Sequence, residues 1–354
     1  MGRRGRIDRD SEFLANIPMR FCGPLKLSGA VNDEIMVPLA TYETPLWPSV
    51  NRGASVSSAA GGIKTTVVDE RMSRSILLEA ESAEAAFQAV QSFQSREAEI
   101  RQTLESSSRF AKLIELNYRF VANLIYIRIE MNTADASGHN MVTLAADTLM
   151  HWLLKKYSDL KYVSVSGNYC TDKKVSAVNS IQGRGKNVIA ETLIPARLCK
   201  RFLKSTATEI ADLNLKKNLI GSIISGSLCS ANAHFANMLL AFYLATGQDA
   251  ANIVEGSQGI VHCENREGDL YFSCTLPNLI VGTVGNGKGL DFVRNNLEKM
   301  NCLSTDNPGE SSRKLAAIAA AVALCGELSL LAALTNPGEL MDSHQKLERQ
   351  SDND

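Results

Sequence analysis

The chain has 354 residues, in which 37 Lys and Arg side chains nearly balance 38 Asp and Glu side chains. This length predicts two structural domains, and a hydrophobic content of 45% is typical of a globular protein with a substantial core. The near-neutral charge argues against a polyanion-binding protein, so we expect no nucleic-acid partner.

The eight cysteines are scattered along the chain, without the close pairs that a zinc site or a redox dithiol requires. We therefore expect reduced thiols, no metal site, and a soluble protein of the cytoplasm. Several arginines lie near the N-terminus, but the apolar stretch of a secretory signal does not follow them.

The first part of the chain predicts strands followed by a helix. Residues 19–56 are rich in Gly, Pro and Thr and contain short apolar runs, which predicts strands and turns, and residues 63–79 continue this pattern. Apolar side chains then recur at helical spacing over residues 82–112, which predicts an amphipathic helix with a break near residues 106–108.

The next segment predicts a strand, a helix and a second strand. Residues 124–131 are rich in β-branched side chains and alternate between apolar and polar positions, which predicts a strand. Residues 140–157 predict a helix, and residues 162–165 predict a further strand. Residues 76–165 therefore form a small α+β unit.

The second half of the chain is dominated by two apolar helices, predicted over residues 231–246 and 311–334. Between them, residues 270–284 resemble a strand that Pro277 interrupts, and residues 290–300 have the pattern of a helix.

The longer apolar helix has about the length that a membrane crossing requires. Its core, residues 315–334, consists largely of alanine, which contributes little to insertion, and Glu327 near the centre would cost about 2.5–3.5 kcal/mol. We therefore predict a buried helix in a large protein core rather than a membrane span.

Residues 282–289, GTVGNGKG, contain the glycines and lysine of a phosphate-binding P-loop. Gly289 stands where that loop needs a Ser or Thr hydroxyl for magnesium. A Gly-rich turn whose backbone lies close to a ligand is therefore the better interpretation, with a nucleotide hydrolase as the alternative.

A second motif places Asp172, Lys173 and Lys174 in a polar loop. Solvated charge is the usual explanation for such a triplet, but a partly enclosed lysine can also stabilise a developing oxyanion. The following GRGK, residues 183–186, either binds phosphate or forms a turn.

Isolated polar residues interrupt the first apolar helix: Asn232, His234 and Asn237, with Asp249 beyond its end. Each alone is usually a satisfied core residue. Together they indicate one wall of a pocket.

Many of these segments recur, in order, in one family. They are VPLATYE (37–43), SVNRG (49–53), DASGHNM (135–141), SGNYCTDKK (166–174), KNLIGS (217–222), NAHFAN (232–237), GQDAA (247–251), GTVGNG (282–287), DNPGE (306–310) and SH (343–344). On these segments the chain resembles the 3-hydroxy-3-methylglutaryl-coenzyme A (HMG-CoA) reductases, and their eukaryotic-like class I in particular.

The resemblance implies an NADPH-dependent oxidoreductase that converts HMG-CoA to mevalonate and free coenzyme A in isoprenoid biosynthesis. It implies an α+β fold, with a large substrate-binding domain around a long central helix (residues 1–75 and 166–354) and an inserted ferredoxin-like NADP(H)-binding domain (residues 76–165). It further implies a homodimer or homotetramer with active sites at the subunit interface, and no membrane.

The resemblance also assigns four catalytic side chains. Lys173 holds the thioester oxygen as negative charge develops, and Asp249 couples Lys173 to Glu43, the proton donor of the second reduction. His344 protonates the departing coenzyme A thiolate as a general acid, and it belongs to a C-terminal tail that folds over the thioester.

The binding residues follow in the same way. The resemblance implies that the hydroxymethylglutaryl group is held by Arg74, Ser166, Asp172, Lys174, Lys217, His234 and Asn237, and coenzyme A by Ser49, Asn51 and Arg52. It assigns the nicotinamide cofactor to Ser108, Arg109, Asp135, His139, Asn140, Met141, Gly285 and Gly287. Arg109 suits a ribose phosphate, which favours NADPH over NADH.

A family member that only binds a coenzyme A ester, having lost its chemistry, is the second alternative. The presence of all four catalytic residue types argues against it.

Overall fold

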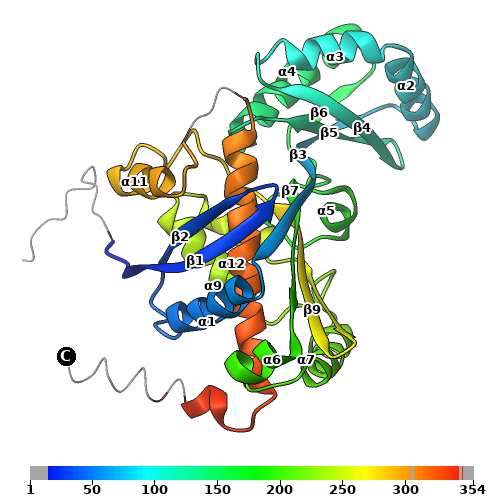
Figure 1. Cartoon of the computed structure of the whole chain (residues 1–354). Helices are drawn as coiled ribbons and strands as arrows, with labels where there is room; N and C mark the ends of the chain where they lie inside the picture. Colours follow the sequence, from blue (N-terminus) through cyan, green and yellow to red (C-terminus); the bar gives the residue numbers. More distant parts are fainter. Residues whose placement is uncertain (1–14, 304–306, 343–344, 346–354) are drawn as a thin grey trace, which may run out of the picture.

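The computed structural model describes residues 15–303, 307–342 and 345, and helix α12 (Glu310–Leu334) runs through the centre of its larger part (Figure 1). This alanine-rich sequence has a high helix propensity. It is the single helix among the described residues that is long and apolar enough to cross a membrane, but 94% of its most apolar window is buried inside the protein. The prediction of a core helix is confirmed.

Helix α1 (Leu46–Ala59) packs directly on α12. A Cβ atom at Gly53 would lie 2.1 Å from the carbonyl oxygen of Cys325, so only glycine permits this approach of the two backbones. The prediction of strands and turns throughout residues 19–56 is wrong for this segment. Its Ser, Val and Gly residues have weak helix propensity, and packing on α12 outweighs that preference.

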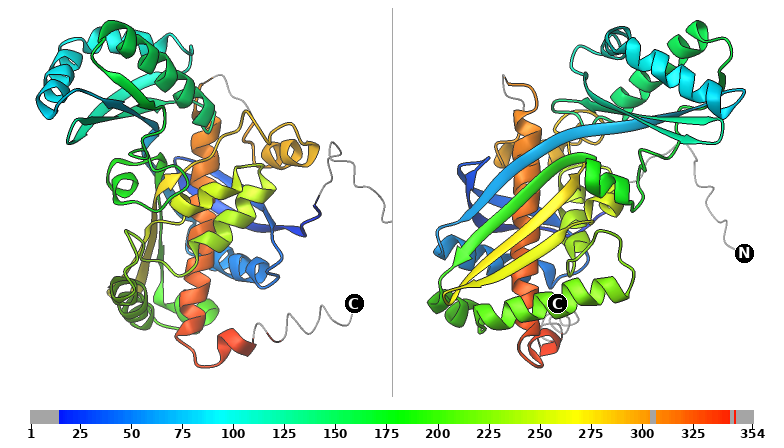
Figure 2. Two further views of the ribbon diagram at one scale, coloured as in Figure 1. Left: turned by 180° about the vertical axis from the view of Figure 1, so that it is seen from behind. Right: turned by 90° about the vertical axis from the view of Figure 1, so that its right-hand side faces the viewer.

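The large sheet lies along α12 and forms the framework of the larger part (Figure 2). Neighbouring strands are antiparallel except for the parallel pair β1 and β3. The strand order is β2 (Asp33–Ala40), β1 (Met19–Gly29), β3 (Ile63–Glu79), β7 (Gly185–Ile194), β9 (Asp269–Leu279) and β8 (Ile260–Arg266).

Strand β9 continues through Pro277, where the sequence predicted an interruption. Its register with β7 shifts between Lys186 and Val188, opposite this proline. The irregularity accommodates a residue that has no N–H to donate, so the strand does not end there.

The small unit extends from Met72 of β3 to Ser164 of β6. With β3 as its first strand, the unit has the element order βαββαβ and the sheet order β6-β3-β5-β4, which is the ferredoxin-like arrangement. The elements after β3 are α2 (Ala83–Ser95), α3 (Glu97–Glu105), β4 (Lys112–Val121), β5 (Leu124–Asn132), α4 (His139–Lys156) and β6 (Lys161–Ser164). The single helix predicted over residues 82–112 is divided at Arg96 and ends at Glu105.

The second half of the chain adds short helices around the large sheet. Helix α9 begins at Phe235 rather than residue 231, because the preceding residues adopt an irregular conformation. The elements are α5 (Ala177–Gln182), α6 (Ala196–Leu198), η1 (Cys199–Leu203), α7 (Ala207–Leu213), η2 (Asn214–Ile220), α8 (Gly221–Ile224), α9 (Phe235–Ala245), η3 (Ala250–Asn252), α10 (Ile253–Gly256) and α11 (Asp291–Lys299).

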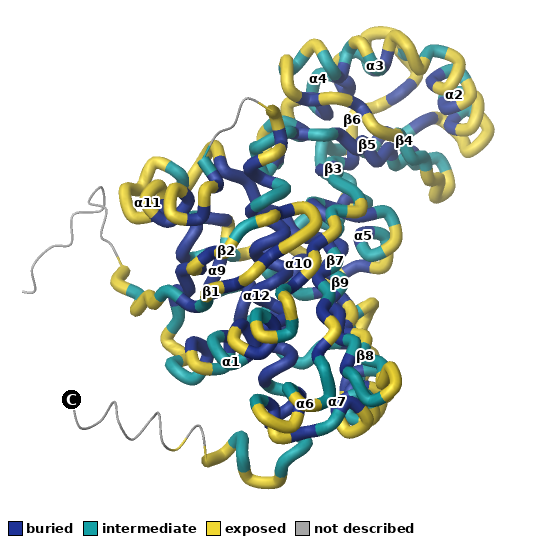
Figure 3. The backbone as a smooth tube through the Cα atoms, in the orientation of Figure 1, coloured by how far each residue is buried: buried dark blue, intermediate teal, exposed yellow. Residues whose placement is uncertain are grey.

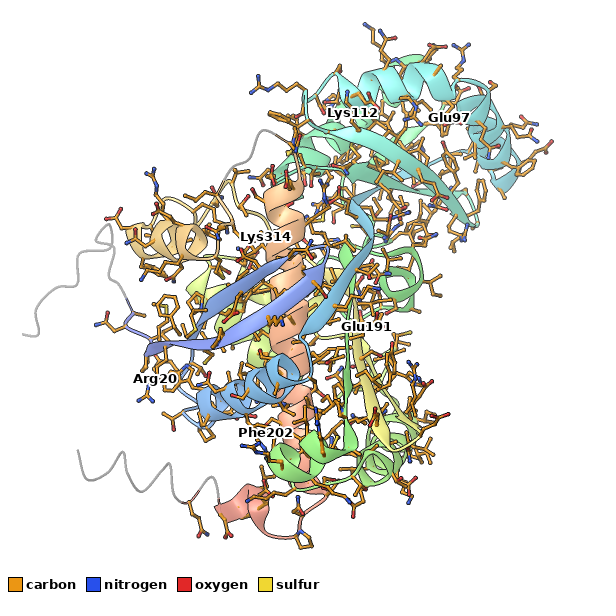
Figure 4. The ribbon with its side chains drawn as sticks, in the orientation of Figure 1. Arg20, Glu97, Lys112, Glu191, Phe202 and Lys314 are labelled. Carbon is orange, nitrogen blue, oxygen red and sulfur yellow. The ribbon has the colours of Figure 1, made fainter. Side chains whose placement is uncertain are left out.

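Two hydrophobic cores result, one around α12 and one inside the small unit (Figure 3). Strand β3 is shared by both, because its first half pairs with β7 and its second half with β5. Lys314 of α12 also bridges to Asp33 of β2 at 3.0 Å, which ties the central helix to the edge of the large sheet (Figure 4).

Candidate active site

A cavity of about 500 Å³ opens where the start of α4 meets the loop before α5 and the glycine-rich loop after β9. Its walls bring together eight of the residues predicted for the site. They are Arg74, Asp172, Lys173, Asp249, His139, Asn140, Met141 and Gly285. Segments far apart in the sequence thus supply one cavity.

Lys173 and Asp249 form an ion pair in the wall of this cavity. The Lys173 ammonium lies 2.7 Å from Oδ2 of Asp249, and both side chains are partly exposed. The hydrogen bond to Asp249 raises the pKa of Lys173 above its usual value. Burial alone would raise the pKa of Asp249, but the hydrogen bonds from Lys173 and the Ala251 N–H lower it. Both groups are therefore charged around neutral pH.

Asp172 is the second carboxylate of the cavity. Its Oδ1 lies 2.9 Å from Arg184 and 3.6 Å from Nε2 of His139, and its Oδ2 lies 3.9 Å from Arg74. Burial opposes its ionisation, but His139 and Arg184 outweigh this effect and hold the pKa of Asp172 well below its usual range. Asp172 is thus a permanent negative charge among cations.

The GRGK segment does not bind phosphate in the way that its sequence suggested. The Arg184 side chain is 1% exposed, and Lys186 is buried with its amine directed at the carbonyl oxygen of Val281. Gly185 has φ +101°, and a Cβ there would lie 2.5 Å from the Leu279 carbonyl oxygen. The segment leads into strand β7, which begins at Gly185, and it carries the buried Arg184 side chain to Asp172.

The glycine-rich loop closes another side of the cavity. Gly285 and Gly287 have φ values of +99° and +82°, and nothing lies within 4 Å of a Cβ placed at Gly285. Lys288 donates a hydrogen bond to the Gly247 carbonyl, and burial lowers the pKa of Lys288 to about 8. Helix α11 begins only at Asp291, so this lysine and loop do not have the arrangement of a P-loop.

A second group of predicted residues gathers at the start of α9, outside the cavity lining. Asn237 donates a hydrogen bond of 2.8 Å to Oε2 of the exposed Glu43. Beside them the buried Glu327 accepts the backbone N–H groups of Ala233 and His234 at 2.9 and 2.6 Å. Burial raises the pKa of Glu327 and lowers the pKa of Lys217. The opposite charges of these two side chains attract each other. Glu43, His234, Asn237 and Lys217 thus share one region.

Helix α1 carries the predicted coenzyme A contacts. Asn51 accepts the Gly23 N–H at 2.9 Å, and Ser49 is half-buried on the same helix. Arg52 donates to the carbonyl oxygens of Phe202 and Leu203 and pairs with Glu339 at 2.8 Å. Its guanidinium links α1 to the segment after α12.

Other predicted residues lie outside the cavity lining. Both carboxylate oxygens of Asp135 accept backbone N–H groups at the start of α12, those of Gly309 and Ser312, at 2.8 and 3.0 Å. Asp135 therefore anchors the central helix.

Ser108 and Arg109 lie in the loop after α3, where Arg109 stacks on Phe110.

Two more substrate-binding candidates make only local contacts. Ser166 accepts a hydrogen bond from Ser164, and the Lys174 amine donates to the Asp172 carbonyl oxygen. His344 falls outside the described residues.

Arg184, Glu255, Lys288 and Glu327 were not predicted for this region. Arg184 and Lys288 lay inside motifs that suggested phosphate, and Glu327 was noted only as a cost to membrane insertion. A single charge in an apolar segment indicates a buried polar partner nearby. This was the feature of the sequence that could have drawn attention to Glu327.

Over nearly its whole length the chain is similar in sequence to one family of known proteins. Residues 14–349 match the family model described as hydroxymethylglutaryl-coenzyme A reductase. The 3-hydroxy-3-methylglutaryl-coenzyme A reductase of Pyrococcus horikoshii is 42% identical over 349 residues, which cover 98% of this chain and 84% of that protein. The reductase of Strongylocentrotus purpuratus is 39% identical over 340 residues, 94% of this chain and 36% of that protein.

Among solved structures, the class II 3-hydroxy-3-methylglutaryl-CoA reductase of Streptococcus pneumoniae bound to NADPH has a similar fold. The TM-score is 0.74 at 19% identity, over 93% of this chain and 88% of that one.

Proposed function

This chain belongs to the hydroxymethylglutaryl-coenzyme A reductase family, and from that premise we propose that it reduces HMG-CoA to mevalonate and coenzyme A. The Lys173–Asp249 ion pair in the wall of a 500 Å³ cavity is the observation that carries the chemistry. An ammonium there can hold a carbonyl oxygen as it becomes negative.

NADPH is the reductant in this proposal, because the Streptococcus pneumoniae reductase of similar fold binds NADPH. The cavity fits a dinucleotide, because the open backbone at Gly285 permits close approach and the buried Nε2 of His139 has no hydrogen-bond partner of its own. His139, Asn140, Met141, Gly285 and Gly287 would hold the nicotinamide end, and Ser108 and Arg109 the ribose phosphate. When bound, the cofactor supplies one hydride in each of two reductive steps.

The protein's own residues then act as follows. Lys173 stabilises the oxygen of the reacting carbonyl, and Asp249 keeps that ammonium charged and oriented. Glu43 donates the proton to the alkoxide in the second step, and His344 protonates the coenzyme A thiolate after the first. Arg74, Ser166, Asp172, Lys174, Lys217, His234 and Asn237 hold the hydroxymethylglutaryl group, and Ser49, Asn51 and Arg52 hold coenzyme A. Asp135, between β5 and α4, supports the cofactor site, because its carbonyl oxygen accepts the Thr283 N–H at the start of the glycine-rich loop at 2.8 Å.

We also propose that the chain belongs to the eukaryotic-like class I. Its 39% identity to the reductase of Strongylocentrotus purpuratus supports this proposal. We propose residues 76–165 as the NADP(H)-binding domain and residues 1–75 and 166–354 as the substrate-binding domain of a soluble cytoplasmic enzyme.

A homodimer or homotetramer completes the proposal, with active sites at the subunit interface. Helix α8 and its neighbours expose a patch of large apolar side chains that a second copy can cover. These side chains are Leu215, Ile220, Ile223, Ile224 and Leu228.

The decisive experiment follows NADPH absorbance with purified protein and HMG-CoA. Two NADPH are expected per thioester consumed, because a thioester accepts two hydrides to become an alcohol. One NADPH per thioester with accumulating aldehyde would contradict the proposal, and ATP-dependent turnover without NADPH oxidation would support a nucleotide hydrolase instead. The same assay with NADH measures cofactor preference.

A further inference from the structure

Behind the cavity wall lies a buried ion pair that the mechanism above does not use. Arg184, immediately before β7, donates to Oε1 of Glu255 on α10 at 2.8 Å, and their side chains are 1% and 0% exposed. Each of these two charges is shielded from water and depends on the other as its partner, because an unpaired buried charge is strongly unfavourable.

Each member of this pair also holds one residue of the neighbouring dipeptide Asp172–Lys173. Oε1 of Glu255 accepts the backbone N–H of Lys173 at 3.1 Å. The second guanidinium nitrogen of Arg184 lies 2.9 Å from Oδ1 of Asp172. One ion pair thus holds both the backbone of Lys173 and the carboxylate of Asp172.

Lys173 needs such support because its backbone is in the left-handed region, with φ +54°. Residues with a Cβ are disfavoured in that conformation, which persists only where the surroundings impose it. The φ value determines the direction in which the Lys173 side chain leaves the loop. A relaxed loop would therefore move the ammonium away from Asp249.

We propose that Arg184 and Glu255 are positioning residues for this reduction: they hold the left-handed backbone of Lys173 and the carboxylate of Asp172, so that the Lys173 ammonium meets the reacting carbonyl oxygen. The proposal rests on the proposed role of Lys173. Neither positioning residue is in the cavity lining, and both act through the loop.

Two variants separate positioning from simple stability. In E255Q the side chain keeps its shape but loses its charge, which leaves Asp172 as the remaining anionic partner of Arg184. The double variant R184M/E255L removes both charges together, so that no unpaired charge remains but the Lys173 N–H and Asp172 lose their partners. The control is Ile210→Ala, which opens a void at a fully buried position of α7, a helix that contributes no residue to the cavity lining.

Two measurements apply to each variant alongside thermal unfolding. Amide hydrogen exchange of a peptide covering residues 168–176 reports directly on the Lys173 N–H and needs no activity. Steady-state NADPH oxidation gives kcat and the KM for HMG-CoA. In the double variant we expect faster exchange in this peptide and a kcat lower by about tenfold or more, with a smaller rise in KM because Asp172 also loses one of its partners.

E255Q keeps an oxygen that can accept the Lys173 N–H, so we expect smaller changes in exchange and kcat in the same direction. This variant keeps the proposal testable if the double variant does not fold. Ile210→Ala should lose stability while exchange at residues 168–176 and kcat stay at their wild-type values. Recovery of kcat together with stability in the double variant, or unchanged exchange in both variants, would overturn the proposal. Absence of NADPH oxidation in the wild-type protein would instead contradict the proposed function, and the exchange experiment would still decide whether the pair holds the loop.

Discussion

The Lys173 ammonium lies 2.7 Å from the Asp249 carboxylate, although the two residues come from separate loops of the larger part. The carboxylate holds a cation where a carbonyl oxygen can reach it, and the raised pKa keeps that cation charged.

Replacing Lys173 with methionine should lower kcat by roughly a hundred- to a thousandfold, the usual effect of removing one oxyanion-stabilising donor. Binding of HMG-CoA, measured by calorimetry, should persist, because the interaction strengthens chiefly in the transition state. Lys216→Met, which removes an exposed lysine on η2, is the matched control and should retain full turnover. Near-normal turnover of folded Lys173→Met would leave this lysine as a solvated charge.

Asp249→Asn should change the pH profile of kcat/KM. Asp249 raises the pKa of Lys173, so this lysine stays charged to higher pH in the wild type and loses its charge only as pH rises through the raised value. Without the carboxylate the pKa of Lys173 falls, and the alkaline limb should move to lower pH.

The control for this profile is Asp212→Asn, which removes the carboxylate of an exposed ion pair with Lys216. Its profile should match that of the wild type. An alkaline limb that Asp249→Asn leaves in place would show that Lys173 ionisation does not limit the reaction.

His344→Gln should greatly slow reduction of HMG-CoA while leaving reduction of added mevaldehyde largely intact, because only the first step releases a thiolate. Both half-reactions can be measured on one preparation, with circular dichroism to verify folding. His151→Gln, at an exposed histidine of α4, should affect neither reaction. Equal losses in both half-reactions would exclude the proposed proton transfer.

Gly53→Ala should destabilise the protein by about 2 kcal/mol, despite the better helix propensity of alanine, because the new Cβ meets the Cys325 backbone. Chemical denaturation measures the free energy of unfolding. Gly289→Ala places its Cβ in open space and should change stability by less than about 1 kcal/mol. A tolerated Gly53→Ala would mean that α1 and α12 separate easily.

The double substitution Ile223→Glu/Ile224→Glu should weaken self-association, because these side chains are 75% and 82% exposed in the apolar patch on α8. Light scattering after size exclusion gives the assembly mass, and kcat should fall with it if the active sites lie between subunits. Val121→Glu, at an exposed position of β4, is the control. An unchanged mass would place the subunit contact elsewhere.

The sequence by itself determined the elements with strong periodicity. The apolar run of α12 predicted a buried helix correctly, because almost all of its side chains are buried. The β-branched residues of β5 predicted a strand correctly, because such side chains favour extended backbone. The sequence also indicated half of the residues that line the cavity, since Lys173, Asp249 and His139 lay in segments shared with one family.

Only the tertiary structure decided which of these residues meet and what holds them. Helix α1 exists because Gly53 allows α12 to approach, and that partner is distant in sequence. Arg184 and Glu255 belonged to segments with no evident relation, yet folding buries them as one pair beneath Lys173. A single sequence reports the burial that each segment prefers but not the partner that satisfies a buried charge, because that partner is selected by the packing of the whole chain.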